Sequence, residues 1–203
     1  MNSSIARPVR LRERLREATQ GAILAAAEQA FAEEGAKARM ESIAARAGIA
    51  VGTLYNHFED RDALWKAICR AKREALLARV DAALEAGRGR PFREALALFV
   101  DALVAHWAEH RAFLTVLVQT EPALPSGKER STAQELAARA VKLVRRGVEQ
   151  GVLRERGADL HAAFLIGMLR NVLLVGVAQA LPAPEGLRDR VVEFFLGGAE
   201  QRP

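Results

Sequence analysis

Two histidines four residues apart are the first side chains in this sequence that could do chemistry. Residues 106–110 read HWAEH, which is the H-x-x-E-H pattern of inverted zinc proteases. Two imidazoles at this spacing on a helix can share a metal ion, but no further ligand is signalled downstream. We therefore expect no metal, no cofactor and no enzymatic activity, with His106 and His110 either in a core or lining a pocket.

A second set of side chains suits contact with a nucleic acid. Residues 49–58 are small, apolar, hydroxylic, amide or aromatic, and none of them is acidic. Gly52 has no side chain to hold the backbone away from base edges, and Thr53 and Asn56 can donate and accept hydrogen bonds. The candidate DNA-binding residues are Arg39, Ala50, Val51, Gly52, Thr53, Tyr55, Asn56, His57 and Arg61.

These residues need a short helix that faces outward. The apolar positions of 40–47 lie on one face of a helix, and Gly48 suits its end. A third short helix through 54–57 follows after a turn, with Leu54 and Phe58 as its buried edge. This order predicts a helix-turn-helix, in which the first helix braces the second and the second enters the major groove of DNA.

The residues around this motif resemble a known family. Residues 39–58 read RMESIAARAGIAVGTLYNHF and continue as EDRDAL, which looks like the DNA-binding signature of TetR-family transcriptional regulators. Upstream, ILAAA at 23–27 with Phe31 and Gly35 is similar to the family's first helix, so the specific match covers about residues 20–70. The resemblance implies a homodimer that places one such helix of each subunit in the major groove of double-stranded operator DNA.

The resemblance also assigns roles by position. Four residues would lie nearest the bases: Val51, Gly52, Tyr55 and Asn56. Three would hold phosphates: Thr53, His57 and Arg61. Two alternatives stay open, because Tyr55 could instead pack the module and Arg39, which stands where a capping Ser or Thr is common, could be a phosphate contact or a solvated charge.

The rest of the chain is predicted to be helical. Forty of the 203 residues are alanine, and no alternating strand pattern of useful length occurs. The predicted helices cover about 11–34, 40–47, 54–57, 61–86, 91–110, 111–120, 128–150, 159–180 and 185–196. We expect an all-α fold of about nine helices, with an N-terminal three-helix helix-turn-helix module and a C-terminal helical bundle. The expected domains are 1–60 for an arm and DNA binding, 61–86 for a connecting helix, and 87–203 for effector binding and dimerisation.

Positive charge is concentrated early in the chain. The net charge is +5, and residues 1–90 hold 16 Lys and Arg against 12 Asp and Glu, whereas residues 91–203 hold 14 against 13. The basic arm before residue 17 indicates either a polyanionic partner or a solvated tail.

Half of the residues are apolar, which argues against disorder. We expect a cytoplasmic protein without a membrane partner, for three reasons. Cys69 is the lone cysteine, there is no secretory signal, and no unbroken apolar run reaches roughly 18 residues.

The resemblance further implies a cavity for a small-molecule effector in the C-terminal bundle. The helical repeat places aromatic, apolar and a few polar side chains along the same faces of these helices, although a filled core would show the same pattern. The candidate pocket residues are Phe99, Leu103, His106, Trp107, His110, Phe113, Leu117, His161, Phe164, Met168 and Asn171. The identity of the effector does not follow from the sequence.

The predicted helix 159–180 is apolar nearly all round, so two opposite faces must each be buried against another part of the assembly. One of these parts is its own domain, and the resemblance implies that the other is a second subunit. The candidate dimer contacts are Leu173, Val177, Val191, Phe194 and Phe195. Arg170 on this helix cannot be buried unpaired. An internal carboxylate is the preferred partner, and an acidic effector or solvent at a dimer seam are the alternatives.

The leading hypothesis is a ligand-responsive, sequence-specific repressor that a small molecule releases from its operator. An activator, or a DNA-binding architectural protein without a ligand, would carry the same DNA-binding residues. An enzyme is supported only by the H-x-x-E-H pattern.

Overall fold

The computed structural model describes residues 6–120, 131–155, 157–178 and 185–199. Over these residues it contains eight α-helices and one 3-10 turn and no strand, which confirms the all-α prediction. The chain forms two compact units, Met1–Lys72 and Arg73–Pro203, which divide within a long helix. The sequence instead set the whole of 61–86 apart as a connecting helix, and that functional division stays a prediction.

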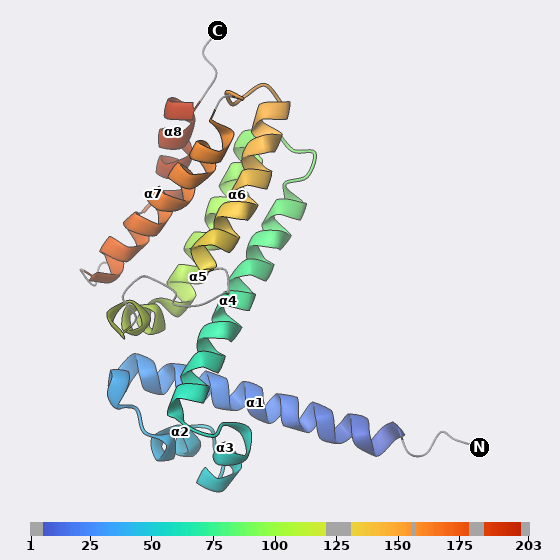
Figure 1. Ribbon diagram of the computed structural model, residues 1–203, viewed down its shortest axis with the longest axis vertical. Coiled ribbons are helices and arrows are strands. Elements are labelled where there is room, and N and C mark those ends of the chain that lie inside the picture. The colour runs from blue at the N-terminus through green and yellow to red at the C-terminus, as the bar shows by residue number, and fades with distance from the viewer. Residues whose placement is uncertain (1–5, 121–130, 156, 179–184, 200–203) are drawn as a thin grey trace. The chain divides into compact units, whose positions relative to one another are not determined.

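The N-terminal unit contains three helices, a 3-10 turn and the start of a fourth helix. They are α1 (Ala6–Glu34), η1 (Gly35–Lys37), α2 (Met40–Arg46), α3 (Val51–His57) and the first turns of α4 (Arg61–Ala86), seen in Figure 1. The helix α1 begins five residues before the predicted start, and α3 begins three residues before it. The core of this unit is apolar and includes Ile23, Ala27, Phe31, Ile43, Leu54, Leu64 and Ile68.

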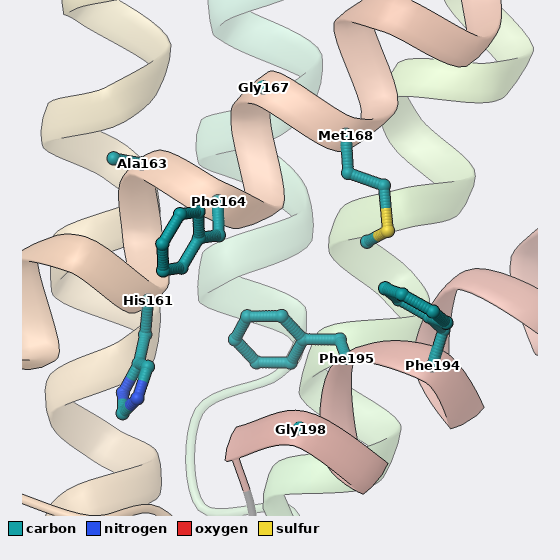
Figure 2. A pocket seen from close by; sticks show the side chains of 8 residues that line it. All are labelled: His161, Ala163, Phe164, Gly167, Met168, Phe194, Phe195 and Gly198. Atoms are coloured by element: carbon teal, nitrogen blue, oxygen red, sulfur yellow. The ribbon is translucent and has the colours of Figure 1, made fainter.

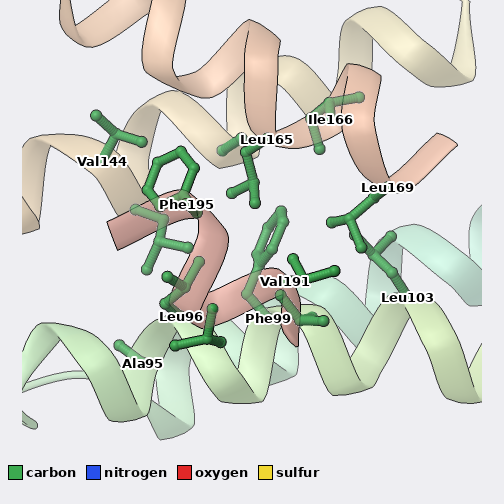
Figure 3. Packing of buried hydrophobic residues seen from close by; sticks show 14 of the residues in the cluster. Ala95, Leu96, Phe99, Leu103, Val144, Leu165, Ile166, Leu169, Val191 and Phe195 are labelled. Atoms are coloured by element: carbon green, nitrogen blue, oxygen red, sulfur yellow. The ribbon is translucent and has the colours of Figure 1, made fainter. Parts of the chain in front are cut away.

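The C-terminal unit is a bundle built in two layers. It comprises the rest of α4 with α5 (Phe92–Thr120), α6 (Thr132–Glu149), α7 (Ala158–Ala178) and α8 (Leu187–Ala199). Within this unit α4, α5 and α6 run side by side, and α7 and α8 pack against α5 and α6 (Figure 1). Figure 3 shows the core between the layers, where Phe99 of α5 meets Leu165 of α7 and Val191 of α8.

The two helices predicted over 91–110 and 111–120 form one helix, α5, with a kink. At His110 the backbone leaves the helical region, with φ −114° and ψ 17°. The predicted break therefore lies at the right residue, but the helix resumes immediately after it. This difference lowers the number of helices from the predicted nine to eight over the described residues.

Local hydrogen bonds fix the ends of the bundle helices. Ser131 and Gln134 form a reciprocal capping box at the start of α6. At the other end of α6, the side chain of Gln150 accepts a hydrogen bond from the backbone N–H of Phe92 at 2.7 Å and donates to the carbonyl of Arg90 at 3.0 Å. These bonds tie the glycine-rich break before α5 to the end of α6.

The helix α7 has the length and composition of a membrane span over Ala158–Gly176. This corrects the expectation that no segment is apolar enough over roughly 18 residues to cross a membrane. One such helix is weak evidence for a membrane, since helices of soluble proteins pass the same test. The observation that matters is that only about a fifth of this stretch is buried within the chain (22%).

Candidate functional site

A glycine turn sets the angle between α2 and α3. Gly48 has φ +67°, a backbone conformation that favours glycine, and its N–H donates to the carbonyl of Ala45 at 3.2 Å. The N–H of Ile49 then donates to the carbonyl of Ala44 at 3.0 Å, so the end of α2 is capped by the turn itself. The predicted helix-turn-helix is therefore present.

The buried edge of α3 leaves the opposite face of this helix open to solvent. Leu54 is fully buried and Phe58 is buried beside it. Ala50, Gly52 and Asn56 are exposed. Tyr55 is 47% exposed, so about half of its surface remains open to solvent. The three remaining residues on this helix are half-buried: Val51, Thr53 and His57.

Gly52 is not required by the fold of the chain. It lies inside α3, and a Cβ atom placed on it would meet no atom within 4 Å. Glycine inside a helix is less favourable than alanine by about 0.5–1 kcal/mol. Open space at this position is what the close approach of another molecule to the α3 backbone would need.

Ion pairs hold α2 against the end of α1. The guanidinium of Arg46 donates to the carboxylates of Glu33 at 2.6 Å and Glu34 at 3.2 Å, and the Glu33 hydrogen bond raises the pKa of Arg46 above its ordinary value. The hydroxyl of Ser42 also donates to Glu34, at 2.9 Å. Lys72 at the end of the unit pairs with Glu28 of α1. These contacts fix the helix that braces α3.

Arg61 and Arg39 stand at helix starts on either side of α3. The carboxylate of Asp60 accepts a hydrogen bond from the N–H of Ala63 at 2.7 Å and so caps α4, where Arg61 is the first residue. The guanidinium of Arg61 lies 6.0 Å from the ring centroid of Phe31, which limits its freedom. Arg39 is exposed and precedes α2 without a side-chain cap, as its residue type predicts.

The predicted effector residues on α5 are mostly buried. Phe99 and Leu103 belong to the core of the bundle, and Phe113 and His106 are also buried. Leu117 and His110 are half-buried, and His110 occupies the kink. Core and pocket wall stay alternatives for each of these residues, and their effector role stays a prediction.

Trp107 differs from its buried neighbours. Its side chain is 6% exposed, and the indole Nε1 has no hydrogen-bond acceptor among the residues that the structure describes. The guanidinium of Arg111 lies 5.7 Å from its ring centroid. A buried N–H without an acceptor is unfavourable by about 1–3 kcal/mol, so an acceptor from a bound molecule would remove a real cost.

A groove of about 510 Å³ lies between α7 and α8. The side chains of Phe164 and Met168 from α7 and of Phe194 and Phe195 from α8 surround it, with His161 at one end (Figure 2). Residues predicted for the effector pocket and for the dimer interface thus lie together in one groove.

The residues predicted for the dimer interface are not equally available. Leu173 packs partly against the core, and Val191 and Phe195 are buried in it. Phe194 is 76% exposed. The side chain of Val177 lies outside the described residues. Of the interface candidates that are described, Phe194 therefore offers the largest free surface.

The structure separates a core side of α7 from an exposed side. The core side is formed by Ala162, Leu165, Ile166 and Leu169. Leu160, Phe164 and Val175 are exposed, as are Gly167 and Asn171. Gly167 and Gly198, which line the groove, were missed, although their spacing from the exposed phenylalanines was a usable signal.

Arg170 is exposed, which corrects the expectation of an internal carboxylate partner. Within the described ranges no carboxylate pairs with it. The sequence favoured an internal carboxylate because a buried guanidinium needs a partner. Because one side is open, the guanidinium reaches solvent and needs no buried partner.

The side chains of the H-x-x-E-H pattern contact other residues of the chain and one another. The guanidinium of Arg79 on α4 donates two hydrogen bonds to the carboxylate of Glu109, at 2.9 and 2.7 Å, and the pair holds the pKa of Glu109 below its ordinary value. The rings of His106 and His110 meet edge to face, 4.7 Å apart. In the part of the chain that the structure describes, no three His, Cys, Asp or Glu side chains are grouped to hold a metal ion.

Comparisons with known proteins agree with the helix-turn-helix and extend the match into the bundle. Residues 23–68 match the family model described as bacterial regulatory proteins, tetR family. Residues 89–174 match the model described as tetracyclin repressor-like, C-terminal domain. No curated protein matches the chain.

Solved structures share the fold at low sequence identity. A TetR transcription regulator from Haloarcula marismortui is 17% identical with a TM-score of 0.75, over 91% of this chain and 100% of that one. The fatty acid degradation regulator FadR from Bacillus halodurans is 22% identical with a TM-score of 0.70, over 89% and 99%. The SmeT–triclosan complex is 21% identical with a TM-score of 0.72, over 91% and 92%. Together with the two family models, which match about two thirds of the residues, the helix-turn-helix and bundle establish that this chain belongs to the TetR family of transcriptional regulators.

Proposed function

We propose that the protein is a cytoplasmic, homodimeric repressor that binds a specific operator and leaves it when a small molecule binds the C-terminal bundle. The main support for sequence-specific DNA binding is the exposed face of α3. Gly52 and Asn56 are exposed there, and the fold does not require glycine at position 52. Asn56 would hydrogen-bond a base edge, and Tyr55 and Val51 would contact bases beside it. Thr53, His57 and Arg61 would hold phosphates, and Arg39 would add a charge at the rim.

The homodimer is supported by the exposed apolar side of α7 and by Phe194 on α8. A dimer would present two α3 helices to half-sites about one helical turn or more apart, so its operator would be a near-palindrome. The basic residues before α2 would then strengthen binding without reading sequence.

An apolar small molecule with a hydrogen-bond acceptor is the effector class that the bundle favours. The candidate walls on α5 are aromatic and aliphatic. The indole N–H of Trp107, which has no acceptor among the described residues, could donate to such an acceptor. A protein of the same fold, SmeT, forms a complex with triclosan. This precedent supports the class and not the identity of the ligand.

The effector would act by favouring a conformation that binds DNA less well. The helix α4 carries residues of both compact units, so a change at its bundle end can alter the positions of the two α3 helices in the dimer. An enzyme is not favoured, because the carboxylate of its one motif is held by Arg79.

Selection of genomic fragments that the purified protein binds is the first test, because it yields the operator and its neighbouring genes. Asn56→Ala should then weaken operator binding more than random DNA by about 1–3 kcal/mol. His57→Ala should weaken both and flatten the salt dependence by about 0.9 in slope for each lost phosphate contact. Equal losses on both DNAs for Asn56→Ala would remove this residue from base reading, and failure to enrich any fragment would contradict the proposed function.

A further inference from the structure

One side of α7 is apolar and exposed, and the rest of the described residues leave it uncovered. It is formed by residues one helical turn apart, defined here as the α7 outer face: Leu160, Phe164, Gly167, Asn171 and Val175. Phe164 is 66% exposed and Val175 is 44% exposed. Phe194 on α8 continues this surface across the groove in Figure 2. Asn171 is the one polar residue on the α7 outer face.

A second copy of the chain is the occupant that this surface fits. The helix α7 is about 32 Å long at 1.5 Å per residue, and with α8 beside it the surface measures on the order of 600 Å². A stable interface takes about 800 Å² from each partner, so most of the required area is present. The surface also holds both projections, Phe164 and Phe194, and open positions, Gly167 and Gly198, as an interface between identical surfaces requires.

We propose that Asn171 lies on the two-fold axis of the homodimer and that its side-chain amide pairs with the amide of the partner's Asn171. The inference rests on the proposed homodimer and deepens it, because it names the residue that sets how the two copies align. The side chain of Asn171 makes no hydrogen bond with the described part of its own chain, and an amide carries both donors and an acceptor. Covered by apolar side chains alone, it would lose its water without a replacement.

Symmetry explains why the partner is another copy of the same residue. In a two-fold interface only residues at the axis meet their own copies, so a lone polar residue is satisfied there by an identical group. A single asparagine in an apolar helix seam fixes register in this way in coiled coils.

Packing favours the same register. If two antiparallel α7 helices cross at Asn171, Val175 of one copy lies opposite Gly167 of the other. A Cβ placed on Gly167 would meet no atom within 4 Å, so there is room for the valine side chain. If the helices instead cross about one turn earlier, between Gly167 and Met168, Asn171 lies opposite Phe164, which offers its amide no partner.

Cysteine cross-linking tests the register in the full-length protein. In a Cys69→Ser background, Asn171→Cys should form a covalent dimer under mild oxidation, because a disulfide joins Cα atoms about 4.4–6.8 Å apart. The matched control is Leu160→Cys, which is exposed on the same face about 16 Å away along the helix. It should give about a tenfold lower yield of covalent dimer at equal concentration.

A mixed pair of variants provides an independent readout. Gly167→Cys and Val175→Cys should each cross-link poorly alone and efficiently when co-expressed, because only the mixed dimer brings the two thiols together. A dimer by sedimentation in which Asn171→Cys does not cross-link, or in which Leu160→Cys cross-links equally well, would overturn the placement of Asn171 and leave the homodimer intact. A protein that stays monomeric, or that is a monomer bound to phosphatidylglycerol vesicles through α7, would overturn both proposals.

Discussion

Replacing Gly52 by alanine should stabilise the fold and weaken operator binding. Gly52 lies inside α3, is exposed, and has no atom within 4 Å of the position of a Cβ. Alanine is more favourable than glycine inside a helix by about 0.5–1 kcal/mol, because glycine loses more backbone freedom on folding. For a chain of this size, that gain corresponds to about 1–4 °C in Tm.

The added methyl group should have the opposite effect on DNA binding. If α3 lies in the major groove, the methyl separates the helix backbone from the base edges. Loss of one close contact costs about 1–3 kcal/mol, and a dimer would suffer it at both half-sites. Because about 1.4 kcal/mol is tenfold in affinity, operator binding should fall by about thirtyfold or more.

The assay measures Tm by thermal denaturation and operator affinity by fluorescence anisotropy on the same samples. Gly21→Ala is the matched control, since Gly21 is exposed inside α1 with open space at its Cβ position. It should give a similar gain in Tm and unchanged affinity. Unchanged affinity for Gly52→Ala would refute the close approach of α3 to DNA, and a lower Tm would refute the reasoning about open space.

Two further predictions concern the bundle. Gly147→Ala should destabilise the fold by about 1–3 kcal/mol, less the gain in helix propensity. The reason is that the added Cβ would lie 2.9 Å from both Leu153 Cγ and Phe92 Cδ2, which are buried. A higher midpoint in urea denaturation would contradict this. Glu109→Gln should flatten the acid side of the stability curve measured between about pH 3 and 7. Arg79 lowers the pKa of Glu109 from its ordinary 4.5. The stability that this pair adds is therefore complete above that value and is lost as the pH falls through the lowered pKa. If the variant lost stability at acid pH in the same way as the unsubstituted protein, the contribution of the pair to stability would be disproved.

The helix-turn-helix was predictable because its signals are local. The apolar face of 40–47, the glycine at residue 48 and the buried pair Leu54 and Phe58 lie within about twenty residues, and each reports a backbone requirement of its own segment. The helix boundaries were less well predicted at α3, whose first turn at Val51 has no side-chain cap to announce it. The exposed face of α3 could be inferred as the side opposite Leu54 and Phe58.

The long-range pairings could not be predicted in this way. The carboxylate of Glu109 belongs to a metal-binding pattern in the sequence, and its bond to Arg79 exists because α4 and α5 run side by side. Thirty residues separate the two side chains, and nothing local to either indicates the other. The same holds for Gln150, which ties the start of α5 to the end of α6.

The sequence by itself determined the helical class, the helix-turn-helix and the family, because periodicity, turn glycines and a dense local motif are carried by neighbouring residues. Only the tertiary structure decided which side of α7 is covered. Phe164 and Leu165 are adjacent and both apolar, yet Phe164 is exposed and Leu165 is fully buried. On a helix that is apolar nearly all round, hydrophobicity does not distinguish the faces, and the packing of α5, α6 and α8 against one of them does.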